Sequence, residues 1–314
     1  MASNLKSENV PIFLVGATGA GKSAVAMELA RAQKMGAAIL AMDAMQVYRG
    51  ADIGTSKPGA AEQGEFPHGG IDLAEFGSSF DVAQYLKHAE VFLREQREAG
   101  RRVIIVGGTG LYFRALTQGL CEAPQGSDEL RVELNALSVE GLQERLKKID
   151  PAMLERLDRA NPRRLIRAIE VKEETGRSLH EWQEETPEPL VREFTAFWIE
   201  RSKEELAQRI EARVETMFAQ GWVEEVQSLV ARHGIEAVRN FPGIGYGEIA
   251  DSCGGQQVND GHRPPLQAKA KRDILVATRQ YAKRQLTWFS REPTLRKAML
   301  SGTQPLPAAL LASP

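Results

Sequence analysis

Residues 16–23 constrain the fold of this chain more than any other segment. They read GATGAGKS and match the pattern G-x-x-x-x-G-K-[ST] of a phosphate-binding P-loop. The apolar run PIFLVG precedes them as an expected strand, and AVAMELARA follows with helical spacing. This context disfavours the alternative of a chance glycine-rich turn. We therefore predict a phosphate site at Gly16, Ala17, Thr18, Gly19, Ala20, Gly21, Lys22 and Ser23, in which backbone amides and a helix N-terminus face the anion.

Further apolar runs predict the rest of a parallel sheet. AAILAMD ends at Asp43, RRVIIVGGTG runs into the helical stretch LYFRALTQGL, and EFTAFWIE at 193–200 returns as another strand. Helical patterns cover about 81–99 and one long segment at 203–233. Buried strands separated by helices indicate an α/β fold, with a P-loop NTPase-like parallel sheet flanked by helices.

The composition shifts between residues 122 and 190, where Glu, Arg and Leu recur at helical spacing with breaks at Asp150-Pro151 and Asn161-Pro162. We interpret 122–190 as an all-helical insertion in a core formed by 1–121 and 191–300. The last part of the core is expected to be helical and basic, with a glycine-rich interruption at 243–261. The small, proline-containing tail at 301–314 is expected to be disordered.

Charge and composition narrow the possible functions. The chain has a net charge of −2, two widely separated cysteines and no apolar run near the roughly 18 residues of a membrane span. We expect a cytoplasmic monomer without a membrane partner, a disulfide framework or a cysteine metal site. The segment from Arg263 to Lys297 contains ten Lys or Arg and only two acidic residues. This excess of positive charge predicts a local surface that binds phosphates.

A carboxylate and a hydroxyl follow two of the expected strands. Asp43 lies where open α/β sheets place their ligands, and it is a candidate general base; capping of the next turn is the alternative interpretation. The expected strand in RRVIIVGGTG ends in Gly107-Gly108-Thr109-Gly110 instead of the acidic residue usual in P-loop ATPases. This weakens the interpretation as a kinase or ATPase. Gln46, Tyr48 and Arg49 favour an acceptor-recognition loop after Asp43.

Eight motifs together resemble one family. GATGAGKS, MDAMQVYRGADIGTSKP, PHGGID, VIIVGGTGLYFRAL, NPRRLIRAIEVKEETGRSL, RIEARVETMFAQGWVEEV, GIGYGE and TRQYAKRQLTWF occur in the order seen in tRNA dimethylallyltransferases, over about residues 11–291. The resemblance implies transfer of a dimethylallyl group from dimethylallyl diphosphate to the 6-amino group of the adenosine 3′ of a tRNA anticodon. The P-loop would hold the diphosphate, with Mg²⁺ at Ser23.

The resemblance also implies residue roles. Asp43 would be the base, Thr109 would contact the target nucleotide, and Arg213 would stabilise the pyrophosphate, with Arg209 as a neighbour on the same helix face. Expected tRNA contacts are Asp43, Ala44, Met45, Gln46, Thr109, Arg131, Arg163, Arg164, Leu165, Ile166, Arg167, Arg279, Lys283 and Arg284. The chain departs from the family pattern at Ala17 and Gly19 in the P-loop, at Ala44 where a serine is usual, and at Gly247 and Glu248 in GIGYGE.

Three alternatives remain open from the sequence. A prenyltransferase acting on free adenine nucleotides would need neither the insertion nor the basic C-terminal helix. A nucleotide or small-molecule kinase would follow from the P-loop alone. A non-catalytic RNA-binding protein would not need Lys22, Ser23, Asp43, Thr109 and Arg213 together.

Overall fold

The computed structural model describes residues 10–33, 36–253 and 265–301, and these divide into two compact units. The first unit is Met1–Phe113 with Val191–Pro314, and the second is Arg114–Leu190. The second unit is therefore inserted in the chain of the first. It starts before the expected boundary at residue 122, because the helix Gly110–Gln118 begins in the first unit and ends in the second.

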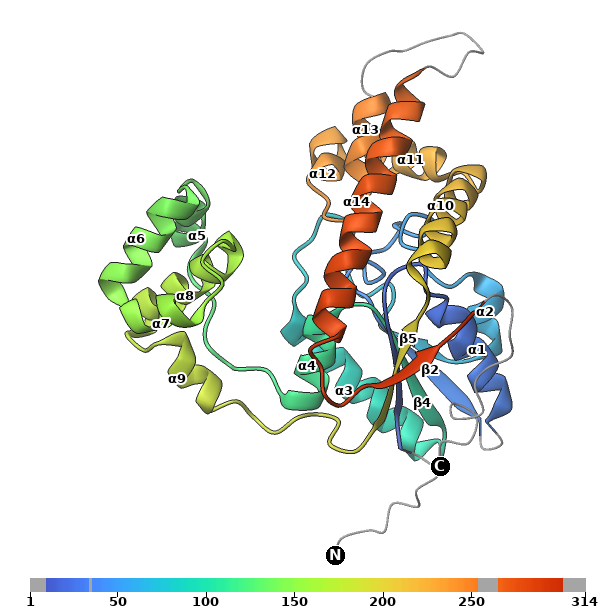
Figure 1. The fold of residues 1–314 in the computed structure, drawn as a ribbon, viewed down its shortest axis with the longest axis horizontal. Helices are drawn as coiled ribbons and strands as arrows, with labels where there is room; N and C mark the ends of the chain where they lie inside the picture. The colour runs from blue at the N-terminus through green and yellow to red at the C-terminus, as the bar shows by residue number, and fades with distance from the viewer. Residues whose placement is uncertain (1–9, 34–35, 254–264, 302–314) are drawn as a thin grey trace, which may run out of the picture. The chain divides into compact units, whose positions relative to one another are not determined.

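The first unit contains a six-stranded sheet with the order β3-β2-β4-β1-β5-β6, in which all neighbouring strands among the described residues are parallel (Figure 1). The strands are β1 Ile12–Val15, β2 Ala37–Met42, β3 His68–Gly69, β4 Arg102–Gly107, β5 Thr195–Glu200 and β6 Arg296–Met299. Gly107 is level with both Val15 and Met42. The loops that leave β1, β2 and β4 therefore start side by side at one edge of the sheet.

Helices cover both faces of this sheet. They are α1 Lys22–Ala32, α3 Val82–Glu98 and α4 Gly110–Gln118, whereas the short helix α2 Ala60–Glu65 is exposed along its whole length. Ile12 and Leu14 face the core that contains α1, whereas Phe13 between them contacts Phe113 of α4 with ring centroids 5.2 Å apart. This alternation is what a strand buried on both faces requires. The predicted α/β fold is confirmed.

The C-terminal part of the first unit is mainly helical, with α10 Lys203–Ala219, α11 Trp222–His233, α12 Ile235–Arg239, α13 Tyr246–Cys253 and α14 Pro265–Phe289. The single helix predicted at 203–233 is wrong. Gly221 has a φ of 98° and separates α10 from α11, because a left-handed residue ends the regular helix. Strand β6 was not predicted, since RKAM begins with two charged residues and forms no apolar run.

The second unit is helical in all its described secondary structure, with α5 Asp128–Asn135, α6 Val139–Ile149, α7 Pro151–Arg156, α8 Pro162–Thr175 and α9 Leu179–Glu184. The predicted breaks are confirmed: Asp150 and Asn161 accept hydrogen bonds from the first turns of α7 and α8, each of which begins with proline. Leucines and isoleucines from α5, α6, α7, α8 and α9 form its core.

Among the described residues, no helix combines the length and the apolar character needed to cross a bilayer. The predicted tail from residue 302 onward and part of the glycine-rich interruption, residues 254–261, lie outside the described residues.

Candidate active site

The P-loop lies between β1 and α1, as predicted. Three of its glycines, Gly16, Gly19 and Gly21, have φ angles of 154°, 82° and 90°, which L-residues with a side chain rarely adopt. Lys22 opens α1, and its Nζ donates a hydrogen bond of 2.8 Å to the carbonyl of Ala17. The lysine therefore folds back over the loop. This is the position from which an ammonium contacts a bound phosphate.

Helix α10 and the residues just before it hold the P-loop. Arg209 donates from Nε to the carbonyl of Gly19 at 2.9 Å, and Arg201 donates to the carbonyl of Ala20 at 3.1 Å. A Cβ atom on Gly21 would lie 2.9 Å from a guanidinium nitrogen of Arg209. The third glycine of the motif thus serves this close approach, and Arg209 supports the loop directly.

Two cations and one carboxylate converge beside the loop. Burial and the nearby guanidinium of Arg213 lower the pKa of Lys22 to about 8, while the carboxylate of Asp43 acts in the opposite direction. Burial also lowers the pKa of Arg213, and Asp43 again opposes this shift. The pKa of Lys22 responds to both Arg213 and Asp43, and the pKa of Arg213 responds to Asp43, so Lys22 from α1, Arg213 from α10 and Asp43 after β2 lie near one another. The sequence predicted all three.

Asp43 and Thr109 fix the turn after β2. The Oδ1 atom of Asp43 accepts a hydrogen bond of 2.8 Å from the amide of Met45, so the capping role is present in the structure. The Oγ1 atom of Thr109 accepts from the amide of Ala44 at 3.2 Å. Both contacts hold the backbone that directly follows β2, and they bring Asp43 and Thr109 to the same turn.

The glycines of the GGTG segment serve close packing. A Cβ atom on Gly107 would lie 2.0 Å from the carbonyl oxygen of Met42, and one on Gly110 would lie 2.4 Å from the Trp288 ring. A Cβ on Gly108 would lie 2.1 Å from the side-chain nitrogen of Gln285. The structure thus gives a packing reason for these glycines: helix α14 approaches the sheet here.

Gln285 is a site residue that the sequence analysis missed. Its Oε1 accepts a hydrogen bond of 2.8 Å from the amide of Thr18, and its Nε2 donates to the carbonyl of Gly108 at 2.9 Å. The side chain is buried and links the P-loop to the GGTG segment. Gln285 is the last residue of the motif TRQYAKRQ, and this position could have marked it as a site residue. The sequence analysis considered only the charged residues of that motif.

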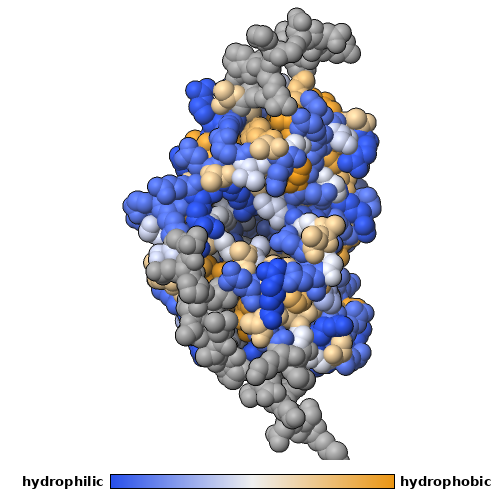
Figure 2. Space-filling model, turned by 90° about the vertical axis from the view of Figure 1, so that its right-hand side faces the viewer, coloured by the Kyte–Doolittle hydropathy of each residue, from blue (hydrophilic) through white to orange (hydrophobic). Residues whose placement is uncertain are grey.

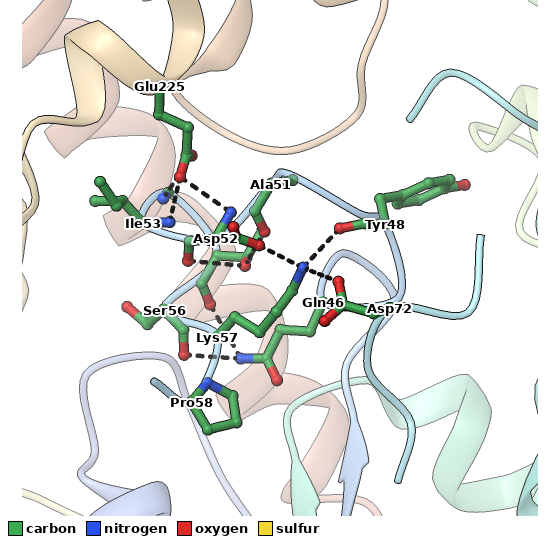
Figure 3. Close-up of polar contacts among 12 residues, drawn as sticks. Gln46, Tyr48, Ala51, Asp52, Ile53, Ser56, Lys57, Pro58, Asp72 and Glu225 are labelled. Atoms are coloured by element: carbon green, nitrogen blue, oxygen red, sulfur yellow. Dashed lines mark hydrogen bonds and ion pairs between the residues drawn. The ribbon is translucent and has the colours of Figure 1, made fainter. Parts of the chain in front are cut away.

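The segment after Asp43 forms a closed loop, shown in Figure 3. Gln46 donates from Nε2 to the carbonyls of Thr55 and Ser56, at 3.1 and 3.0 Å. Met45 packs against the apolar cluster built around Trp222 and Tyr246. Gln46 and Met45, predicted as RNA contacts, therefore also have structural partners within the loop.

The predicted RNA contacts in the second unit fall into two groups. Arg163 and Arg164 are exposed on α8. Arg131, in contrast, donates to the buried carboxylate of Glu170 at 2.7 Å, and Arg167 donates to the carbonyls of Ala123 and Pro124. These internal hydrogen bonds give Arg131 and Arg167 a structural role in the second unit.

Two apolar residues in the same predicted run need correction. The side chain of Leu165 is fully buried in the core of the second unit, and Ile166 packs against that core. Their side chains position α8 and are not available for the predicted RNA contact, because apolar side chains on the inner face of an amphipathic helix are withdrawn from the surface.

The predicted basic side chains of α14 are exposed. Arg279 lies 3.6 Å from Glu211 of α10, and the guanidinium of Arg284 lies 5.7 Å from the centre of the Tyr281 ring. Lys283 is exposed between them in the sequence.

On the face shown in Figure 2, hydrophilic residues predominate, apolar residues form small patches, and a recess opens near the middle.

The described residues contain no group of three His, Cys, Asp or Glu side chains that could hold a metal ion. Ser23 follows Lys22 in the first turn of α1 and is exposed. A hydroxyl at this position of a P-loop suits Mg²⁺, which takes most of its other ligands from water and substrate phosphates.

Comparison with known proteins agrees with this geometry. The sequence model of the family described as IPP transferase matches residues 46–292, and that described as isopentenyl transferase matches residues 11–66. The tRNA dimethylallyltransferase of Methylacidiphilum infernorum is 44% identical over 297 residues, which cover 93% of this chain and 86% of that protein.

Solved structures give the same result. The crystal structure of the tRNA isopentenylpyrophosphate transferase of Bacillus halodurans is similar with a TM-score of 0.61 and 30% identity, over 93% of this chain and 90% of that one. A eukaryotic dimethylallyltransferase that acts on tRNA shares the fold, with a TM-score of 0.76 and 22% identity over 93% and 74% of the two chains. The chain belongs to the IPP transferase family, together with the tRNA dimethylallyltransferases that it matches over most of their length.

Proposed function

We propose that this protein transfers a dimethylallyl group from dimethylallyl diphosphate to the 6-amino group of the adenosine 3′ of the anticodon in tRNA, with release of pyrophosphate. The convergence of Lys22, Arg213 and Asp43 at one edge of the sheet is the observation that carries the proposal. The names of the relatives support the choice of donor and acceptor.

The P-loop side of the site is suited to the leaving group. Cleavage of the bond between the allylic carbon and the diphosphate oxygen places additional negative charge on that oxygen. The cations of Lys22 and Arg213 neutralise this charge, and the backbone amides of residues 16–23 hold the phosphates. Mg²⁺ bound at Ser23 would supply further neutralisation of the diphosphate. The partial withdrawal of both cations from water strengthens their effect.

The carboxylate side of the site is suited to the acceptor. The adenine nitrogen forms a bond to the allylic carbon as pyrophosphate departs, and one proton of the amine passes to Asp43. This amine is a very weak acid, so proton transfer accompanies or follows the attack. Thr109 contacts the nucleotide near Asp43. Because the base is stacked in the anticodon loop, it must turn out of the stack to reach Asp43.

An activity assay tests this function. Purified protein is incubated with dimethylallyl diphosphate, Mg²⁺ and unmodified tRNA, and the digested RNA is searched for isopentenyladenosine by mass spectrometry. Product in RNA supports the proposal, and its absence with a full pool of adenosine-bearing tRNAs contradicts it. Efficient prenylation of AMP would indicate a free-nucleotide enzyme, and ATP-dependent phosphoryl transfer would indicate a kinase.

A variant assigns the base. Asp43→Ala is expected to abolish nearly all turnover and to leave tRNA binding largely intact, because the variant loses proton transfer and keeps the other expected RNA contacts. Loss of binding in this variant would assign Asp43 to structure instead.

A further inference from the structure

The loop after Asp43, residues 43–57, is closed by a buried lysine. Lys57 Nζ donates hydrogen bonds to the carbonyl of Tyr48 at 2.7 Å, to Asp52 Oδ1 at 2.6 Å and to Asp72 Oδ1 at 2.7 Å (Figure 3). Its side chain is 3% exposed. An ammonium has three hydrogens to donate, and each has a partner here. Lys57 therefore ties both arms of this loop, which we call the acceptor loop, to the segment that carries Asp72.

A glutamate from another element holds the tip of the acceptor loop. Glu225 of α11 accepts hydrogen bonds from three successive amides, those of Asp52, Ile53 and Gly54, at 3.1, 2.6 and 3.3 Å. The hydroxyl of Tyr246 in α13 donates to the same carboxylate at 2.7 Å. Charge-assisted hydrogen bonds to backbone amides are strong and directional. The tip is thus fixed to α11 and α13.

The acceptor loop and the segment that carries Asp72 each contain an unusual backbone conformation next to Lys57. Ser56 has a φ of 51° and Asp72 has a φ of 52°, and both are non-glycine residues in the left-handed region. Such conformations persist where the surrounding contacts determine them. Ser56 precedes Lys57, and Asp72 is one of its partners, so the strained positions coincide with the ion pairs.

This closure determines how Gln46 is oriented. Its side-chain nitrogen donates to the carbonyls of Thr55 and Ser56, which Lys57 and Glu225 hold in place from either side. Within the described residues its Oε1 has no hydrogen-bond partner, so this atom can accept one from a substrate. The loop thereby presents one defined hydrogen-bonding face next to Asp43.

We propose that Lys57 and Glu225 are positioning residues for the acceptor adenosine. They act through the acceptor loop, which they hold in the shape that presents Gln46 and the turn at Asp43. The inference rests on the proposed function and extends it. The donor site should not depend on them, because Arg209 and Gln285 hold the P-loop from α10 and α14.

The test compares kinetic constants for the two substrates. In Lys57→Met, Asp52 and Asp72 lose their cation but reach water, since their side chains are 57% and 35% exposed. We expect the variant to fold, with kcat/KM for tRNA reduced about tenfold or more and KM for dimethylallyl diphosphate within about twofold of the wild type. Glu225→Gln should give the same pattern, because the amide offers one acceptor oxygen in place of two.

A control variant shows whether the loss of kcat/KM for tRNA is specific to Lys57 or follows from removing any ion pair. Arg31→Met removes the surface pair between Arg31 of α1 and Glu65 of α2, whose nitrogen and oxygen lie 2.6 Å apart. This variant is expected to match the wild type in both substrates. The double variant Lys57→Met with Glu225→Gln should lose less than the product of the two single losses, because both residues hold one loop.

Each outcome decides the inference. If the wild type forms no isopentenyladenosine, the proposed function fails, and the inference fails with it. If the wild type is active and folded Lys57→Met retains the kcat/KM for tRNA, the proposed function stands and the positioning role is wrong. A parallel rise in KM for both substrates would show general loosening and would also contradict it. If Lys57→Met does not fold, Glu225→Gln decides by the same criteria.

Discussion

The side-chain oxygen of Gln285 accepts a hydrogen bond of 2.8 Å from the amide of Thr18, which lies 267 positions earlier in the chain. The other end of the same amide group donates to Gly108, in the loop after β4. One buried side chain therefore joins the phosphate loop to the segment that carries Thr109. The relative position of the donor and acceptor sides of the site depends on this link.

Replacing Gln285 with glutamate tests that link. The two side chains have the same shape, but the carboxylate has no hydrogen to donate to Gly108 and places two acceptors face to face. We expect Gln285→Glu to reduce kcat/KM for dimethylallyl diphosphate about tenfold, because an unpaired buried acceptor costs about 1–3 kcal/mol. Steady-state kinetics measure the change. Gln280→Glu, on the exposed side of the same helix, is the control and should retain the wild-type constant.

Donor binding should depend on pH through Lys22. Its pKa is about 8 in the free protein, and a bound diphosphate raises that pKa because it favours the ammonium. Affinity is therefore full below pH 8, where Lys22 already carries its proton. Above pH 8 binding must take up a proton, so Kd rises by up to about tenfold per pH unit until the pKa of the complex.

Calorimetry in buffers with different ionisation enthalpies measures this uptake directly. Dimethylallyl diphosphate should bind with nearly one proton taken up at pH 9 and almost none at pH 7. Lys22→Met removes the titrating group and should show no uptake of this kind. Equal uptake by the wild type and the variant would assign the proton to another group.

Arg213 should act on the transition state more than on substrate binding. Its charge lies with Lys22 beside the P-loop, where the departing pyrophosphate gains negative charge. Arg213→Met is expected to lower kcat about 10²- to 10³-fold, the usual cost of removing one such contact. Single-turnover rates with saturating substrates measure the change. Arg97→Met, at an exposed position on α3, is the control, and an equal loss there would contradict the assignment.

Glycine is required at position 110 by packing. A Cβ atom there would lie 2.4 Å from the ring of Trp288, which is too close for any real contact. Gly110→Ala should lower the free energy of unfolding by about 1–3 kcal/mol, because the indole or the helix must move. Gly64→Ala in α2 is the matched control. Nothing lies within 4 Å of a Cβ at that site, so alanine should stabilise by up to about 1 kcal/mol. Denaturant unfolding compares the two.

The exposed arginines of the second unit should affect the salt dependence of tRNA binding, whereas Arg131 should affect the stability of the protein. Arg163→Ala or Arg164→Ala removes an exposed charge, and the slope of log K against log salt should fall by about one for each phosphate that the variant no longer binds. Arg131→Ala instead leaves the buried Glu170 without its bidentate partner. We expect that variant to lower the melting temperature of the protein. An unchanged melting temperature would contradict the structural role of Arg131.

The sequence was sufficient for elements whose signals are local. The strands β1, β2, β4 and β5 were predicted because each is an apolar run with clear boundaries. The breaks at Asp150-Pro151 and Asn161-Pro162 were predicted because proline interrupts a helical pattern, and in the structure a new helix starts at each of these prolines. Strand β6 could not be predicted, since its RKAM sequence pairs only where β5 offers a free edge.

The same limit applies to the site. Lys22 and Asp43 were found because a motif or the end of a strand marks them. Gln285, Lys57 and Glu225 were not assigned roles, because a glutamine, a lysine or a glutamate in a polar run reads as a surface residue. Their partners lie on other elements, and the distances between them exist only after folding.

The sequence by itself determined the α/β fold, the phosphate loop and the order of the functional groups, because these depend on short patterns of residue types. The tertiary structure decided where each charge is used. Arg131 is paired with the buried Glu170, while Arg163 faces solvent. Lys57 is enclosed by Asp52 and Asp72. The physical reason is that a charge withdrawn from water needs a partner, and only the folded chain brings that partner within hydrogen-bonding distance.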